Sequence, residues 1–244
     1  MKKSHKSRRV LKVSGVIILI LLLATWLVIK FKTYSSMEQA KEIMKQENVI
    51  KENNTIIITP EGDVNANFVF YQGGLVETEA YAVLGEKLAK KGIRVFIPYM
   101  PFNLAILNID AFDKIYEEYN NDKDWYIGGH SLGGASASMY VDKSSKPIEG
   151  LILMGAYPSD STDLSKQDIK VLSVRAINDK IMNLDNYNKS KELLPDSTDY
   201  VNLNGNHSNF GYYGFQKGDG ESSISREEQH NLVVEEIIKL IDLD

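Results

Sequence analysis

The sequence contains no cysteine, and it shows neither internal repeats nor low-complexity stretches. The absence of cysteine excludes disulfide scaffolds, cysteine-ligated zinc, iron–sulfur clusters and thiol nucleophiles. At 244 residues, with 43% hydrophobic and 25% charged residues, the composition is that of a folded globular protein. This length leaves room for one principal domain and little else.

Acidic residues are missing from the first 32 positions, which carry eight Lys or Arg. Residues 33–244 hold the other 20 Lys or Arg against all 33 Asp or Glu, a net charge of −13. A protein that binds nucleic acid needs a basic surface to neutralise phosphates. The acidic body of this chain therefore argues against nucleic acid as a partner.

Charge is also absent from the apolar run at residues 13–29, VSGVIILILLLATWLVI. As a helix, these residues would extend roughly 26 Å, slightly less than a hydrocarbon core of ~30 Å. Lys12, Lys30 and Lys32 can reach the headgroups and close the difference. We predict an uncleaved transmembrane anchor at 13–32. A cleaved signal peptide is the alternative, although no small-x-small cleavage site follows the run.

The flanking charges predict the orientation of this anchor. Six Lys or Arg precede the apolar run and two follow it. Because positive charge is retained in the cytoplasm, residues 1–12 form a cytoplasmic basic tail and residues 33–244 lie outside. The predicted location is the outer face of a bacterial cytoplasmic membrane, with a single crossing.

The remainder divides into a predicted stalk at 33–54 and a domain at 55–244. The stalk is polar, with a short helical pattern around Glu38–Gln46. From residue 55, short β-rich runs alternate with helical patterns, which predicts βαβ units and a doubly wound, mostly parallel sheet with helices on both faces. The predicted strands are Thr55–Thr59, Asn67–Tyr71, Ile93–Pro98, Asp124–Gly128, Gly150–Met154, Ile169–Arg175 and Thr198–Leu203. The predicted helices are 78–91, 108–120, 132–143, 185–194 and 225–242, the last capped by Ser225.

The motif G-x-S-x-G occurs at residues 129–133, Gly-His-Ser-Leu-Gly. An apolar strand runs into it and a helix of small residues follows, so the chain must turn from strand to helix at Ser131. Such a turn strains the backbone and requires glycine on both sides. It raises the serine hydroxyl above the sheet, at a helix N-terminus that favours negative charge. We predict Ser131 as a nucleophile.

A serine nucleophile needs a general base, and the chain offers four histidines. His5 lies in the basic tail, and His130 occupies the variable position of the motif. His230 lies on a charged stretch of the last helix, where we expect it to be solvated. His207 directly follows the last predicted strand, at the edge where open α/β sheets place active groups. We therefore predict His207 as the base.

The carboxylate that orients this histidine should follow the preceding strand, because the order in this architecture is serine, acid, histidine. Asp179 is the first acidic residue there and the preferred choice. Asp185 is the second choice, and we expect it to be the N-cap of the next helix. The oxyanion would be held by the N–H of Leu132 and by one from the loop at 72–75. Gly74 is the preferred residue of that loop, with Gly73 and Leu75 as alternatives.

Together these residues resemble the α/β-hydrolase superfamily, and more narrowly its small lid-poor bacterial members related to dienelactone hydrolases. The resemblance covers residues 55–244 and rests on the segment 128–134, the junction at Asp179 and the Asn206-His207 loop. It implies a Ser131–His207–Asp179 triad. One departure is Gln72-Gly73, where many members have His-Gly.

The predicted activity is a serine hydrolase, in particular a carboxylesterase, that needs no cofactor and no metal. Only about a dozen residues lie within 155–168, which is too few for a helical lid. The apolar segment at 99–107 forms either a pocket wall or core, and it favours a short-to-medium acyl, lipid or cell-wall ester as the small-molecule substrate. An amidase or peptidase would use the same triad, and a non-catalytic binding module remains a different class. The sequence contains no indication of the oligomeric state.

Overall fold

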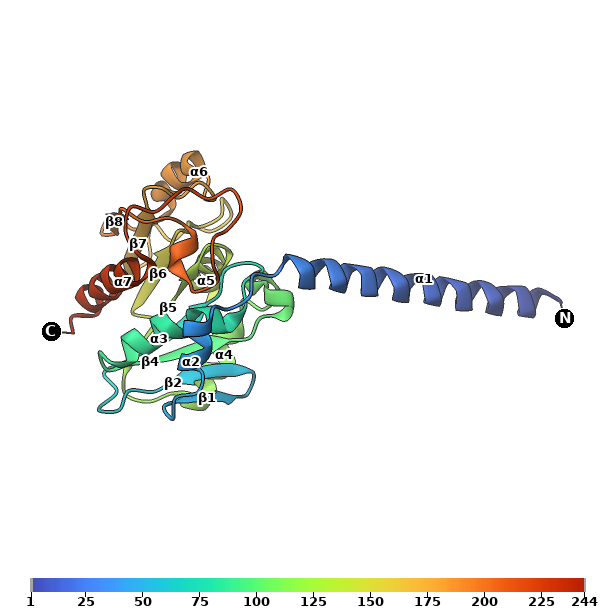
Figure 1. The fold of residues 1–244 in the computed structure, drawn as a ribbon, viewed down its shortest axis with the longest axis horizontal. Helices are drawn as coiled ribbons and strands as arrows, with labels where there is room; N and C mark the ends of the chain where they lie inside the picture. The colour runs from blue at the N-terminus through green and yellow to red at the C-terminus, as the bar shows by residue number, and fades with distance from the viewer. Residues whose placement is uncertain (1, 244) are drawn as a thin grey trace. The chain divides into compact units, whose positions relative to one another are not determined.

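The computed structural model describes residues 2–243 and, within them, the side chains of residues 13–21 and 23–243. These residues form two compact units, one ending at Thr33 and the other beginning at Tyr34. The first unit is a single helix, α1 (Lys2–Lys32) (Figure 1). Among the described residues, only its segment Val13–Lys32 is a helix long and apolar enough to cross a membrane, a property it shares with signal sequences.

The second unit begins earlier than the sequence suggests. Residues 34–54, predicted as a stalk, belong to the compact unit and contain α2 (Glu38–Ile43) and β1 (Val49–Glu52). Strand β1 pairs antiparallel with β2 (Thr55–Ile58) at one edge of the sheet. Only Val49 of this edge strand is buried, so its polar sequence shows no strand pattern.

The second unit contains one eight-stranded sheet in the order β1-β2-β4-β3-β5-β6-β7-β8. The six strands from β4 to β8 in this order run parallel, whereas β2 runs antiparallel to β4. The remaining strands are β3 (Ala66–Tyr71), β4 (Ile93–Pro98), β5 (Asp124–His130), β6 (Gly150–Met154), β7 (Lys170–Ala176) and β8 (Asp199–Leu203). The predicted doubly wound α/β fold is thereby confirmed.

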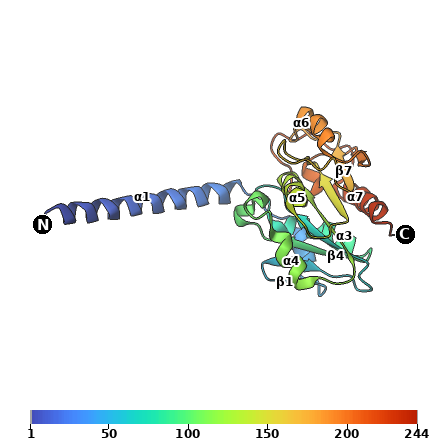
Figure 2. The same ribbon diagram turned by 180° about the vertical axis from the view of Figure 1, so that it is seen from behind.

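Helices cover both faces of this sheet. Besides α2, the α-helices of this unit are α3 (Ala82–Ala89), α4 (Ala111–Tyr119), α5 (Leu132–Lys143), α6 (Leu184–Lys189) and α7 (Arg226–Ile241). Short 3₁₀ turns are η1 (Thr78–Tyr81), η2 (Pro101–Asn103), η3 (Ala105–Leu107), η4 (Ser190–Leu193) and η5 (Ser208–Phe210). Helices α2, α3 and α7 lie on the face turned toward the viewer in Figure 1, and α4 and α5 lie on the opposite face, seen in Figure 2.

The two faces have separate cores, because successive side chains of a strand point to opposite sides. In β3, Phe68 and Phe70 pack with α3 and α7, whereas Val69 and Tyr71 pack with α4 and α5. All of β3 is buried, and its sequence from Phe68 to Tyr71 is a continuous apolar run rather than an alternating one. Burying each of these aromatic side chains contributes roughly 1.5–3 kcal/mol to folding.

The ends of the predicted elements shift by a few residues at most. The helix predicted at 78–91 divides into η1 and α3, and that at 185–194 divides into α6 and η4. Ser225 caps α7 as predicted, since its side chain accepts a hydrogen bond from Glu228 N–H. The segment 155–168, all of which the structure describes, contains no helix and therefore no helical lid.

Candidate active site

Ser131 occupies the turn between β5 and α5 and has a strained backbone conformation, with φ 54° and ψ −123°. Positive φ is rare for a residue with a side chain and costs on the order of 1–3 kcal/mol. The backbone holds this conformation through hydrogen bonds on both sides. Ser131 N–H donates to Met154 O at 3.0 Å, and Ser131 O accepts from Ala135 N–H at 3.1 Å. The strain therefore lifts a half-buried serine out of the sheet at the start of a helix.

The glycines that flank the turn are required by space. A Cβ at Gly129 would lie 2.4 Å from Tyr71 O, and one at Gly133 would lie 2.1 Å from the same atom. Real Cβ atoms do not approach backbone this closely, so no other residue fits without movement of β3. The spacing of the motif thus follows from the close packing of α5 against the end of the neighbouring strand.

His207 and Asp179 form a buried pair. Nδ1 of His207 lies 2.6 Å from Oδ2 of Asp179, and their side chains are 2% and 1% exposed. The other carboxylate oxygen accepts the N–H groups of Ile181 and Met182, both at 2.8 Å. Because the carboxylate accepts at Nδ1, the imidazole carries its proton there and leaves Nε2 free as a base.

The serine turn and the His207–Asp179 pair meet at Gly155, which follows the carbonyl that Ser131 N–H contacts. A Cβ at Gly155 would lie 3.1 Å from His207 Nδ1 and 3.3 Å from Asp179 Oδ2. The ring of His130, next to the serine, lies 4.3 Å from the His207 ring between centroids. Among the described residues, no hydrogen bond joins Ser131 Oγ to His207. In enzymes without a bound substrate, such a hydrogen bond is often long or poorly aligned.

The loop after β3 provides one free donor beside the serine. Gly73 N–H donates to Tyr81 Oη at 3.0 Å, and Leu75 N–H donates to Asn103 O at 2.8 Å. Within the described hydrogen bonds, Gly74 N–H has no acceptor. A Cβ at Gly74 would lie 3.1 Å from Leu132 Cδ2, so this free N–H is close to the first turn of α5, whose own N–H groups are also free.

Gln72 holds this loop in place. Its side-chain amide donates to Val76 O at 2.7 Å and to Asn103 Oδ1 at 2.9 Å, and its Oε1 accepts from the Thr78 hydroxyl. The side chain is fully buried, and its hydrogen bonds go to Val76, Thr78 and Asn103. Gln72 therefore shapes the loop and leaves backbone donation to its neighbours.

The histidine loop is held by two side chains that no sequence pattern singles out. Asp219 accepts Ser208 N–H at 2.7 Å and the Ser208 hydroxyl at 2.6 Å, and it also contacts His207 N–H at 3.4 Å and Lys180 N–H at 3.3 Å. Gln229 of α7 forms reciprocal hydrogen bonds with the backbone N–H and carbonyl preceding the histidine. Asp219 thus joins the loop of the histidine to the loop of the acid.

Two expectations from the sequence are wrong. His230 is buried rather than solvated, with 1% exposure, and its ring contacts Tyr212 edge to face at 5.0 Å. Asp185 is not the N-cap of α6. That position belongs to Asn183, whose side chain accepts Asn186 N–H at 2.9 Å.

Part of the apolar segment at 99–107, predicted as either a pocket wall or core, is core, and part is exposed. Met100 and Ala105 are core, whereas Phe102, Ile106 and Leu107 are exposed. The aromatic side chains Phe210, Tyr212 and Tyr213 are buried and act in packing.

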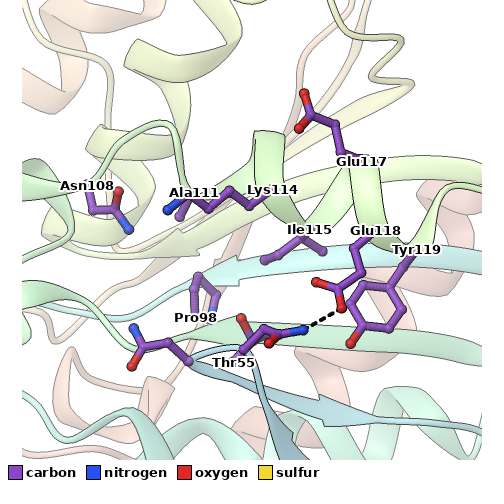
Figure 3. A pocket seen from close by; sticks show the side chains of 11 residues that line it. Thr55, Pro98, Asn108, Ala111, Lys114, Ile115, Glu117, Glu118 and Tyr119 are labelled. Carbon is purple, nitrogen blue, oxygen red and sulfur yellow. Dashed lines mark hydrogen bonds between the residues drawn. The ribbon is translucent and has the colours of Figure 1, made fainter.

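A groove of about 630 Å³ lies between β2, the end of β4 and α4 (Figure 3). It is polar, with Lys114 and Glu118 at its wall and a hydrogen bond from Asn53 to Glu118 across it. Ser131, His207 and Asp179 do not line it. This groove is therefore separate from the serine and its histidine.

A mostly parallel sheet with a strained serine after β5 and a histidine–carboxylate pair after β8 and β7 is the arrangement of the α/β hydrolases. The chain belongs to the alpha/beta hydrolase family, since the model of that family matches residues 67–231, more than half of the chain. No curated protein sequence matches it.

Solved structures share the fold at low sequence identity. Est1E from Butyrivibrio proteoclasticus, solved with ferulic acid, is 13% identical with a TM-score of 0.60, over 80% of this chain and 99% of that one. Acyl-protein thioesterase 2 from Zea mays is 12% identical with a TM-score of 0.58, over 78% and 100%. A dienelactone hydrolase from Anabaena variabilis is 11% identical with a TM-score of 0.54, over 78% and 95%. The chain is thus a hydrolase by family, and these structures share its fold.

Proposed function

We propose that the protein is a membrane-anchored serine esterase in which Ser131 attacks the carbonyl carbon of a carboxylic ester. The observation that carries this proposal is the buried hydrogen bond of 2.6 Å between His207 and Asp179, next to a serine in a strained turn. A loop histidine without a chemical role would not need a buried carboxylate partner, because burying such a pair costs free energy.

The proposed reaction is acyl transfer to water in two steps. His207 Nε2 takes the proton of the Ser131 hydroxyl while Oγ bonds to the carbonyl carbon. The same proton then passes to the alcohol oxygen as the ester bond breaks. In the second step His207 takes a proton from water, the hydroxide attacks the acyl-enzyme, and Ser131 recovers its proton. Asp179 holds the imidazole and stabilises its charged form throughout.

The N–H groups of Leu132 and Gly74 are the proposed donors to the oxyanion. Among the three candidates in the loop, only Gly74 retains an N–H without an acceptor in the described structure. Each such donor contributes about 10²–10³ to the rate in enzymes of this mechanism.

We also propose that α1 is an uncleaved anchor that crosses a bacterial cytoplasmic membrane with the N-terminus inside. Its apolar segment and the excess of basic residues before it support this topology. The proposed substrate is a small ester with a short-to-medium acyl chain, or a lipid or cell-wall ester. A thioester or an amide would pass through the same intermediate, and a panel of matched substrates distinguishes them.

The decisive experiment exposes the full chain, in detergent micelles, to a fluorophosphonate that labels activated serines. We expect labelling of the parent protein and its loss in Ser131→Ala and in His207→Ala. Ser138→Ala is the matched control, since Ser138 lies in the same helix and its hydroxyl donates to Ala135 O. A folded parent that does not label contradicts the proposal and favours a binding module.

A further inference from the structure

An apolar surface lies beside the loop that holds Gly74. It consists of Phe102, Ile106 and Leu107, with exposures of 53%, 41% and 54%, and we refer to it as the apolar loop. The surrounding residues 99–109 carry no charge, although the domain as a whole is strongly acidic. Neighbouring Leu104 reaches within 3.8 Å of a Cβ built at Gly74. Clustered exposed apolar side chains indicate an interaction surface, whereas single ones do not.

The backbone is strained at the residues that expose this surface. Phe102 and Asn103 are both left-handed, with φ of 55° and 57°. Asparagine tolerates this region, but an aromatic residue does so rarely. Asn103 is at the same time tied inward, since its carbonyl accepts Leu75 N–H at 2.8 Å and its side chain accepts from Gln72 at 2.9 Å. The exposed Phe102 side chain therefore projects from a rigidly held turn.

The apolar loop is also connected to the residue that follows the anchor. Tyr34 N–H donates to Leu75 O at 2.8 Å, and the N–H of the same Leu75 donates to Asn103 O. Glu77 fixes the next residues, because it accepts the N–H and hydroxyl of Ser36 at 2.7 and 2.9 Å. Leu75 therefore links Tyr34, at the start of the domain, to Asn103, which lies within the apolar loop segment, through one hydrogen bond on each side.

The anchor ends close to this point along the chain. Helix α1 extends to Lys32, so a single residue lies between it and Tyr34. Two peptide units span at most about 8 Å. The connection between α1 and the first bonded residue of the domain is therefore short.

We propose that the apolar loop docks into the surface of the bilayer that α1 crosses, so that Ser131 hydrolyses esters held in that bilayer. The inference rests on the proposed anchor and esterase activity. The occupant is lipid because the loop is apolar, uncharged and tied to the residue at which the chain leaves the membrane. Apolar side chains of this kind insert at the boundary between headgroups and acyl chains.

The absence of cysteine allows a direct test with single-cysteine variants. Ile106→Cys is labelled with a nitrobenzoxadiazole fluorophore in the full chain, reconstituted into phosphatidylglycerol and phosphatidylcholine vesicles. Ile50→Cys is the matched control, since Ile50 is also an isoleucine, 47% exposed, but lies on edge strand β1. We expect nitroxide-labelled lipid to quench the probe at 106 at least about twofold more than the probe at 50, because quenching requires contact with acyl chains.

A second test compares two substrates. The variant Phe102→Asn/Ile106→Gln/Leu107→Gln, in which asparagine suits the left-handed position, is assayed on an ester in vesicles and on a water-soluble acetate. We expect the ratio of the two activities to fall about tenfold or more, as the loss of apolar burial weakens docking. Ile50→Gln should leave the ratio unchanged.

The outcomes separate this inference from the functions on which it rests. Release of the protein by alkaline carbonate overturns the anchor, and failure to label with fluorophosphonate overturns the esterase. Equal quenching at 106 and 50 overturns the docking surface, as does an equal loss of both activities, which would place the loop in the substrate pocket. Excimer emission between pyrene labels at 106, without quenching by lipid, would place a second copy there instead.

Discussion

The hydroxyl of Tyr81 lies 2.9 Å from Nδ1 of His130, directly beside the serine turn. The same hydroxyl oxygen accepts Gly73 N–H, so its own proton is available for the histidine. Burial raises the pKa of Tyr81, which keeps that proton in place. In this arrangement Tyr81 donates to Nδ1 of His130, and only Nε2 of the histidine lacks a partner. If Nδ1 of His130 donated to Tyr81 instead, the hydroxyl proton of Tyr81 would lack a partner as well. Tyr81 therefore joins the loop at 72–75 to the strand that leads into Ser131.

Tyr81→Phe should lower the free energy of unfolding by about 1–3 kcal/mol, because it leaves two buried polar groups without partners. Urea denaturation measures the effect. Tyr119→Phe is the control, since it removes only an exposed hydrogen bond to Glu52 and should cost less than about 1 kcal/mol. Equal losses in the two variants would contradict the proposed role of Tyr81.

Asp179→Asn should reduce kcat by about 10⁴ with little change in KM, because an amide at this position favours the wrong tautomer of His207. Ester hydrolysis at pH 7 gives both constants. Asp185→Asn should behave like the parent, since Asp185 is exposed and lies in the first turn of α6. A stronger effect at Asp185 would reassign the acid.

Asp219→Ala should lower kcat by about 10–10², because the loops of His207 and Lys180 lose their common partner and small displacements of a base are costly. Steady-state kinetics tests this, with thermal unfolding to verify that the variant is folded. Asp196→Ala removes an exposed carboxylate and serves as the reference. An unchanged kcat in folded Asp219→Ala would show that the histidine loop is held without it.

Stability should decline in mild acid because of two buried histidines. Burial lowers the pKa of His130 well below its usual 6.5 and that of His230 to about 3. Below pH 6.5 the unfolded chain binds protons that the folded chain excludes, so the free energy of unfolding falls with pH by up to about 1.4 kcal/mol per unit for each histidine. His230→Leu should remove one of these contributions. Urea titrations between pH 6.5 and 4 that give parallel curves for parent and variant would refute the prediction.

The residues just after α1 should matter for stability. A chain that begins at Tyr34 retains the contacts with Leu75 and Glu77, whereas one that begins at Glu38 loses them. We expect the free energy of unfolding of the shorter chain to be about 2–4 kcal/mol lower, since a hydrogen bond to a carboxylate contributes about 1.5–3 kcal/mol. Equal denaturation midpoints would mean that residues 34–37 are a stalk after all.

Much of the fold could be predicted because its strands are buried on both faces. A continuous apolar run such as Leu151–Met154 is typical of a strand that helices cover on both sides. The serine turn could also be predicted, since its glycines are required by the backbone of β3 rather than by a particular substrate. The edge strand β1 was missed for the opposite reason. It is exposed at most positions, so its composition does not differ from that of a linker.

The supports of the candidate site could not be predicted. Asp219 reads in sequence as part of a Gly-Asp-Gly turn, and its role depends on two loops that only the tertiary structure brings together. The charged residues around His230 in the sequence predict an exposed side chain, whereas the structure buries it on the inner face of its helix turn. Such contacts join residues far apart in the chain and leave no local pattern.

The segment at 34–37 has a consequence for the order of folding. Its partners include Lys217 and Arg226, at separations of 183 and 189 residues along the chain. A ribosome delivers residues 34–37 among the first of the domain and their partners among the last. The segment can bind Leu75 and Glu77 early, but it can complete its contacts only after nearly the whole domain has emerged. These two contacts close loops of 183 and 189 residues, so the start and the end of the domain join only when synthesis is almost complete.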